Sequence, residues 1–70
     1  MSFDEFLEYV VAFLNDCPGE MRIGQFAFSQ LFQSHRDIAE EISGTDDDPF
    51  YDDTRLMRFL QRVGKEVVRQ

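Results

Sequence analysis

The sequence predicts an all-α fold, a compact bundle of three main helices plus one short helix. Apolar residues recur every three or four positions over most of the 70 residues, which is the spacing of one helical face. Ser-x-x-acid patterns, which cap helix N-termini, occur at Ser2–Glu5 and at Ser34–Asp37. Segments with proline or glycine separate the periodic stretches. Because a chain this short holds one core at most, we expect a single domain over residues 1–70.

The first helix is predicted to begin with Ser2 as N-cap and Glu5 as its capping-box partner. It should end at residues 15–19, Asn-Asp-Cys-Pro-Gly, because proline and glycine both oppose helix continuation. Helical spacing predicts a buried face of Phe3, Phe6, Leu7, Val10 and Leu14. Val11 and Phe13 widen the apolar surface beyond this one stripe.

The second helix is predicted over about residues 21–33, with Ile23, Ala27, Phe28, Leu31 and Phe32 as its apolar stripe. Gly24 near its start should allow another backbone segment to approach closely. A short third helix over about residues 35–42 follows, with Ser34 and Asp37 as its capping pair. Gly44 is placed to end this helix in the left-handed conformation.

Residues 44–53 are predicted to form a loop, because they hold five carboxylates and a proline. We name this segment the acidic loop. Phe50 and Tyr51 lie in its middle, and two adjacent aromatic residues are unusual in a solvated linker. We therefore expect Phe50 to anchor the loop onto the core.

The last helix is predicted to start near Thr54, with Asp53 as its N-cap. Its buried face should consist of Leu56, Phe59, Leu60, Val63 and Val67. Gly64 would be a weak point inside this helix, worth about 1 kcal/mol relative to alanine.

Charge is divided unevenly along the chain. Residues 1–53 carry 13 acidic and two basic side chains, a net charge of −11, whereas residues 54–70 sum to +4. This layout bears on partners and solubility rather than on fold. Cys17 is the single cysteine, which excludes an internal disulfide and fits a reducing compartment.

The sequence is not expected to carry a targeting signal or a membrane span. The first residues lack the basic region of a signal peptide, and no apolar run approaches the roughly 18 residues of a membrane span. We therefore expect a cytoplasmic protein without membrane contact. Because a core of this size gives limited stability, self-association is a further possibility.

Neither a metal site nor a catalytic site is predicted. An EF-hand beginning at Asp46 would place Phe50, Tyr51 and Met57 where an oxygen ligand, glycine and glutamate are needed. Cys17 and His35 could form a nucleophile and base, but a helix C-terminus disfavours a thiolate, and a packing role for the cysteine is preferred. We expect no cofactor and no enzymatic activity.

The last helix carries a basic stripe of Arg55, Arg58, Arg62, Lys65 and Arg69. It could bind nucleic acid or an acidic partner, although the negative body would repel phosphate over a Debye length of about 8–10 Å. The preferred interpretation is that these residues pair with carboxylates of the neighbouring helices and loop.

The negative charge of the body allows two interpretations. Carboxylates on a compact helical body could mimic nucleic-acid phosphates and occupy the basic groove of a nuclease or DNA-binding protein. The simpler interpretation is that the charge maintains solubility. If a partner binds, the predicted contact surface is Asp46, Asp47, Asp48 and Asp52.

Three stretches carry a resemblance to a known group of proteins: residues 22–28 (Arg-Ile-Gly-Gln-Phe-Ala-Phe), residues 38–45 (Ile-Ala-Glu-Glu-Ile-Ser-Gly-Thr) and residues 48–53 (Asp-Pro-Phe-Tyr-Asp-Asp). With Phe59, they resemble a group of small phage- and prophage-encoded proteins, over roughly residues 22–60. The resemblance supplies no activity. It implies an accessory protein of the bacterial host cytoplasm, in which Phe50 and Tyr51 are structural and Asp53 caps a helix.

The predicted function is therefore that of a non-enzymatic, phage-type accessory protein, which binds a host or phage protein with a basic surface and modulates it, with inhibition as the expected effect. One alternative is an oligomeric module that dimerises through apolar surface around Val11 and Phe13. The other is a nucleic-acid binder that uses the basic stripe.

Overall fold

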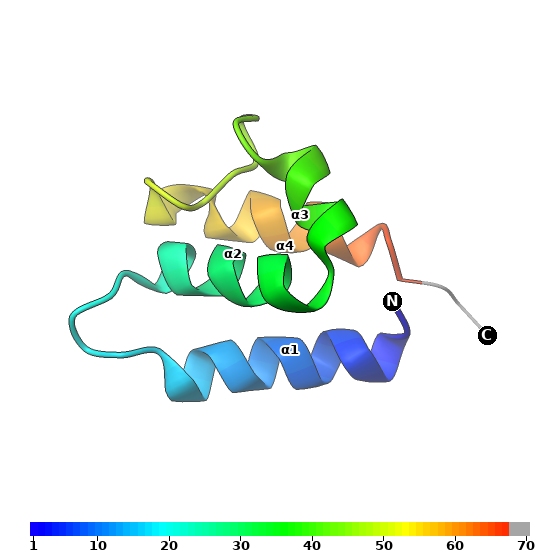
Figure 1. The fold of residues 1–70 in the computed structure, drawn as a ribbon, viewed down its shortest axis with the longest axis horizontal. Helices are drawn as coiled ribbons and strands as arrows, with labels where there is room; N and C mark the ends of the chain where they lie inside the picture. The colour runs from blue at the N-terminus through cyan, green and yellow to red at the C-terminus, as the bar shows by residue number, and fades with distance from the viewer. Residues whose placement is uncertain (68–70) are drawn as a thin grey trace.

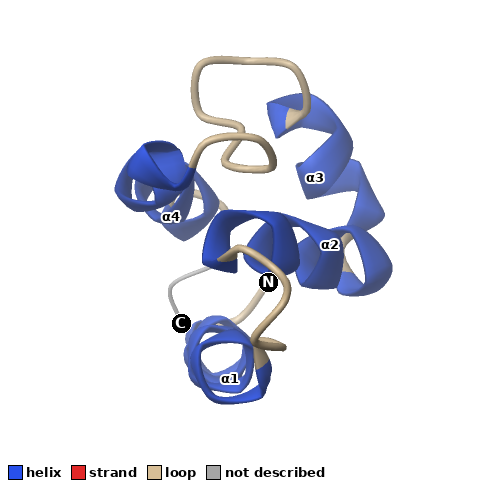
Figure 2. Cartoon of the chain, turned by 90° about the vertical axis from the view of Figure 1, so that its left-hand side faces the viewer, coloured by secondary structure: helices blue, strands red, loops and turns tan. Residues whose placement is uncertain are grey.

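Residues 1–67 of the computed structural model fold into helices joined by short turns (Figure 1). The elements are α1 (Phe3–Asp16), α2 (Ile23–Ser34), α3 (Arg36–Ile42), the 3₁₀ turn η1 (Asp53–Arg55) and α4 (Leu56–Gly64). α2 lies in the centre, with α1 along one side of it and α3 and α4 on the other (Figure 2). The predicted class of three main helices and one short helix is confirmed. No helix within residues 1–67 has the length and apolar character needed to cross a membrane.

The capping box at the start of α1 is confirmed. The Glu5 backbone N–H donates to Ser2 Oγ at 3.1 Å, and the Ser2 backbone N–H donates to Glu5 Oε1 at 3.3 Å. The helix ends at Asp16, because Cys17 has extended backbone angles (φ −61°, ψ 121°) and Pro18 lacks the N–H that a further turn would need.

The predicted buried face of α1 is wrong in part. Phe3, Leu7 and Leu14 expose 59%, 45% and 58% of their surface, whereas the helix packs inward with Phe6, Tyr9, Val10 and Phe13. Two aromatic residues one turn apart select this face. The Tyr9 ring lies 5.1 Å from the Phe13 ring, and the Tyr9 hydroxyl donates to the Ala27 carbonyl of α2.

The core lies between α2 and the elements around it. Its buried side chains are Phe13, Ala27, Phe28, Leu31, Ile38, Ala39, Ile42, Phe59 and Val63. Phe28 is the aromatic centre, with ring centroids 6.0 Å from Phe50 and 6.2 Å from Phe59. Phe50 therefore anchors the acidic loop as predicted. Tyr51 rests its ring on Phe50 but is 80% exposed, so it does not pack into the core.

Gly24, in the first turn of α2, is where the acidic loop touches the helix. An alanine Cβ at this position would lie 2.4 Å from the Pro49 carbonyl oxygen and 2.8 Å from Asp53 Oδ1. The Gly24 N–H donates to that same Asp53 oxygen at 3.0 Å, which caps α2 from across the fold. The predicted close approach of another backbone is confirmed.

The capping pair predicted for the third helix is wrong. Ser34 is the last residue of α2, and its hydroxyl donates to the Gln30 carbonyl one turn earlier at 3.1 Å. His35 is the N-cap of α3 and makes no side-chain capping bond. Beyond α3, Gly44 has φ of 78°, so the predicted left-handed position is confirmed.

The start of the last helical segment also differs from the prediction. Asp52 is the N-cap, because its carboxylate accepts the Thr54 N–H at 3.0 Å, while Asp53 is used at Gly24. α4 ends at Gly64, which is therefore a terminal rather than an internal helix residue. Val67, predicted on the buried face, is half-buried beyond the helix end.

Candidate functional site

The predicted acidic contact surface is largely engaged within the molecule. The Asp48 carboxylate accepts the backbone N–H groups of Gly44 and Phe50, each at 2.9 Å, and so fixes the loop conformation. Asp52 caps η1 and lies 3.6 Å from Arg55. Asp46 is exposed and forms no ion pair among residues 1–67. Of the predicted surface, Asp46 is therefore the residue best placed to meet a partner.

Asp47 joins the acidic loop to the basic stripe of α4. Its carboxylate lies 3.4 Å from Arg58 Nε and 3.4 Å from Arg62 Nη1. Together with the Arg55–Asp52 pair, these contacts confirm the predicted pairing with neighbouring carboxylates for Arg55 of η1 and for Arg58 and Arg62 of α4. Lys65 is exposed, and Arg69 lies outside the described residues.

Arg22, just before α2, holds the other end of the acidic loop. Its guanidinium donates to the backbone carbonyls of Phe50 at 2.6 Å and Tyr51 at 3.3 Å. Arg36 pairs with Glu40 at 2.8 Å and stacks over the Phe32 ring at 5.1 Å. Both arginines are exposed, but their guanidinium groups contact other groups of the same molecule.

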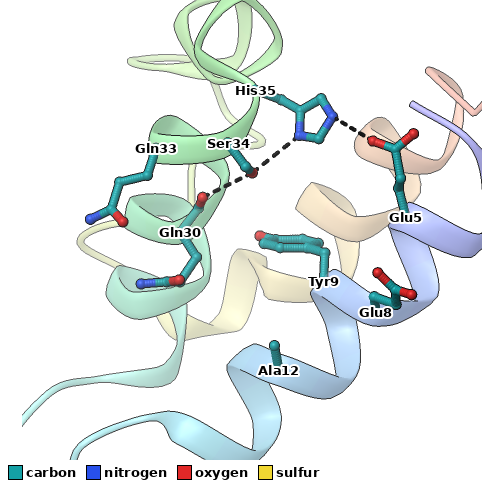
Figure 3. Close-up of a pocket in the computed structure, with 8 residues that line it drawn as sticks. All are labelled: Glu5, Glu8, Tyr9, Ala12, Gln30, Gln33, Ser34 and His35. Carbon is teal, nitrogen blue, oxygen red and sulfur yellow. Dashed lines mark hydrogen bonds and ion pairs between the residues drawn. The ribbon is translucent and has the colours of Figure 1, made fainter.

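A hollow of about 420 Å³ lies between α1 and the C-terminal end of α2 (Figure 3). Its lining residues are Glu5, Glu8, Tyr9, Ala12, Gln30, Gln33, Ser34 and His35. The sequence interpretation missed this hollow, because the polar residues from α1 lie 21 or more positions from those at the end of α2 and form no local motif.

His35 crosses the mouth of the hollow and links α1 to the α2–α3 junction. Its Nε2 lies 3.3 Å from Glu5 Oε2, and its Nδ1 lies 3.1 Å from Ser34 Oγ (Figure 3). The Ser34 hydroxyl donates its one hydrogen bond to the Gln30 carbonyl, so its oxygen is left to accept a hydrogen bond from Nδ1. His35 Nε2 faces the Glu5 carboxylate, with which the imidazole forms an ion pair when it is protonated.

This arrangement anchors a helix but does not activate a nucleophile. A serine nucleophile must give its proton to the imidazole, whereas the Ser34 proton points to a backbone carbonyl. Cys17 lies at the other end of α1 from Glu5, and its thiol donates to the Met21 carbonyl at 3.4 Å. The structure therefore does not bring Cys17 and His35 together. Within residues 1–67, no three His, Cys, Asp or Glu side chains converge as metal ligands.

Two capping carboxylates make the stability of the fold depend on pH in the acidic range. Hydrogen bonds from the Ser2 backbone and hydroxyl lower the pKa of Glu5 below its usual 4.5, and His35 contributes. Hydrogen bonds from Thr54 lower the pKa of Asp52 below its usual 3.8. Because the folded state binds these protons more weakly than the unfolded state, their stabilisation is present at neutral pH. It is lost as the pH falls through the lowered pKa values.

We expect the double variant Glu5→Gln/Asp52→Asn to lose less stability between pH 6 and pH 3 than the unmodified protein. The amides keep the capping geometry but do not titrate in this range. Urea unfolding at both pH values measures the difference. Glu8→Gln/Asp46→Asn is the matched control, since neither residue has an ion-pair partner among residues 1–67. A pH dependence equally reduced in the control would contradict this explanation.

Many surface carboxylates have no ion-pair partner within the part of the chain that the structure describes. Among residues 1–67, eight exposed carboxylates form neither an ion pair nor a side-chain hydrogen bond: Asp4, Glu8, Asp16, Glu20, Asp37, Glu41, Asp46 and Glu66. They are distributed over α1, α3 and the connecting segments. The negative charge left after internal pairing is therefore spread over the body and is not confined to the acidic loop.

No protein-family model, curated protein or solved structure matches this chain. The resemblance to small phage-encoded proteins therefore stays a prediction.

Proposed function

We propose that this protein is a small, non-enzymatic accessory protein that binds another protein with a basic surface and modulates its activity. The observation that carries the proposal is a contrast between the arginine side chains, which are paired within the molecule, and the exposed carboxylates, which are not. Arg22, Arg36, Arg55, Arg58 and Arg62 contact carboxylates or carbonyls of the same molecule. Exposed carboxylates outnumber these contacts and remain available to lysine and arginine side chains of a partner.

Electrostatics of this kind act mainly on the rate and specificity of association. A strongly charged surface steers a partner of opposite charge and excludes partners of like charge. A basic nucleic-acid-binding groove is one surface that would be attracted, and occupation of such a groove would inhibit its owner. Mimicry of nucleic acid, directed at a nuclease or DNA-binding protein, is thus the form of inhibition that we propose.

Binding of nucleic acid through α4 receives less support. Arg58 and Arg62 share the Asp47 carboxylate, and Arg55 faces Asp52, so phosphate would have to displace three existing ion pairs. Exposed pairs of this kind are weak, each worth about 0–1 kcal/mol, but the surrounding negative charge also opposes phosphate.

The proposal predicts that partner capture depends on exposed carboxylates that form no ion pair among residues 1–67. The triple variant Glu20→Lys/Glu41→Lys/Asp46→Lys changes the net charge from −7 to −1 at exposed positions. In affinity purification from a bacterial host with nuclease treatment, we expect the variant to recover less of the partner. We also expect its binding to depend less on salt.

The matched control keeps every charge: Glu20→Asp/Glu41→Asp/Asp46→Glu should recover as much partner as the unmodified protein. Circular dichroism of both variants checks that the helices are intact. A partner retained by the charge-reversed variant with an unchanged salt dependence would show that the acidic surface does not recruit it.

A further inference from the structure

α1 presents a second apolar face that residues 1–67 leave exposed. Four large apolar side chains, Phe3, Leu7, Val11 and Leu14, expose between 45% and 59% of their surface. Their spacing of four, four and three residues places them on one side of the helix. Over eleven residues at 1.5 Å each, this row is about 16 Å long. We name it the α1 docking face.

The docking face is distinct from the side of α1 that completes the core. Phe6, Tyr9, Val10 and Phe13 pack against the rest of the protein, and the exposed row lies beside them around the helix. Single exposed apolar residues are common on protein surfaces. Four of them in a continuous row are typical of an interaction surface.

The charges beside the row indicate what kind of surface it fits. Asp4 precedes Leu7 by three residues, and Glu8 precedes Val11 by three, so both carboxylates lie beside the docking face. Neither forms an ion pair among residues 1–67. α1 contains four acidic residues and no basic residue.

This charge pattern opposes a second copy as the occupant. Two α1 helices packed face to face would bring the Asp4 and Glu8 rows of both chains close to the shared seam, and like charges there are destabilising. Each chain also carries a net charge of −7. A helix with an apolar stripe and flanking lysine or arginine residues would instead match both the row and its edge.

We propose that the α1 docking face binds a basic amphipathic helix of the partner protein. The inference builds on the proposed function and specifies where on this chain the partner binds. The apolar row would contribute most of the affinity, as buried anchors do at other interfaces, and Asp4 and Glu8 would fix orientation and raise the association rate.

The test uses an 18-residue leucine–lysine peptide whose leucines fall on one helical face. The control peptide has the same composition with its leucines distributed around the helix. We expect the full-length protein to bind the first peptide at least about tenfold more tightly than the second, by fluorescence anisotropy, because only the first can cover the row. Equal affinity for both peptides would mean that the protein binds them through net charge alone, and this result would overturn the proposal.

Variants locate the contact on the protein. Val11→Gln/Leu14→Gln should weaken binding of the amphipathic peptide by about tenfold or more, the effect typical of interface anchors. Met57→Gln is the matched control, since Met57 is a 67% exposed apolar residue of α4 away from the docking face. It should leave affinity within about twofold of the unmodified protein. Glu8→Gln should reduce the salt dependence more than Glu41→Gln on α3.

Two results would reject the docking face. Neither of them would decide whether the proposed function is correct. If Val11→Gln/Leu14→Gln binds the peptide normally while charge reversal at Glu20, Glu41 and Asp46 abolishes binding, acidic recruitment holds but this surface is wrong. If sedimentation shows that the unmodified protein is a dimer that Val11→Gln/Leu14→Gln dissociates, a second copy is the occupant. Loss of the natural partner on charge reversal tests the proposed function independently of either result.

Discussion

Replacing Phe13 with alanine is expected to lower the free energy of unfolding by about 3–5 kcal/mol, the usual cost of truncating a buried phenylalanine. Phe13 is fully buried, and its ring contacts Tyr9 at 5.1 Å between centroids. Domains of this size have little stability in reserve, so we expect the variant to be largely unfolded at 37 °C. Urea denaturation followed by circular dichroism measures the loss.

The neighbouring residue provides the control. Leu14 is 58% exposed, so Leu14→Ala removes a side chain of comparable size without opening a cavity, and we expect a change within about 0.5 kcal/mol. The pair therefore tests which face of α1 is buried. A Leu14→Ala variant as unstable as Phe13→Ala would mean that the helix is rotated relative to this structure.

Replacing Gly24 with alanine is expected to have the second large effect. The new methyl group would lie 2.4 Å from the Pro49 carbonyl oxygen, and this contact cannot be relieved without moving the acidic loop. Overpacking of this kind costs about 1–3 kcal/mol. If the loop moves, the Gly24–Asp53 hydrogen bond is lost as well, for roughly 1 kcal/mol more.

Gly64→Ala is the matched substitution without a clash, because nothing lies within 4 Å of the added Cβ and Gly64 ends α4. It should be neutral or stabilising by up to about 1 kcal/mol, from helix propensity alone. Thermal unfolding of both variants gives the comparison. A Gly24→Ala variant that matches Gly64→Ala in midpoint would contradict the tight contact between the acidic loop and α2.

The sequence was sufficient to predict those features that depend on residues close together in the chain. The Ser2–Glu5 capping box, the left-handed Gly44 and the anchoring of Phe50 follow from residues within a few positions of one another. The buried face of α1 was not determined in this way. Apolar residues cover more than half of that helix, so two faces fit the helical period, and only the packing against α2 distinguishes them.

The capping roles of Ser34 and Asp53 failed for a related reason. Ser34 could begin α3 or end α2, and its hydroxyl bonds backward to Gln30. Asp53 could cap the segment after it, but its carboxylate accepts the backbone N–H of Gly24, 29 positions earlier. The polar hollow of Glu5, Ser34 and His35 likewise needs the helices in place before it exists.

The tertiary cap at Gly24 has a consequence for the order of folding. α1 holds its capping pair within its own first turn, so it can gain this stabilisation as soon as its residues become helical. α2 has no local side-chain cap and gains one only after the chain has returned to place Asp53 beside it. Closing that long loop costs entropy before the contact forms. Opening of the acidic loop would therefore also loosen the first turn of the central helix, which makes the two a single cooperative unit.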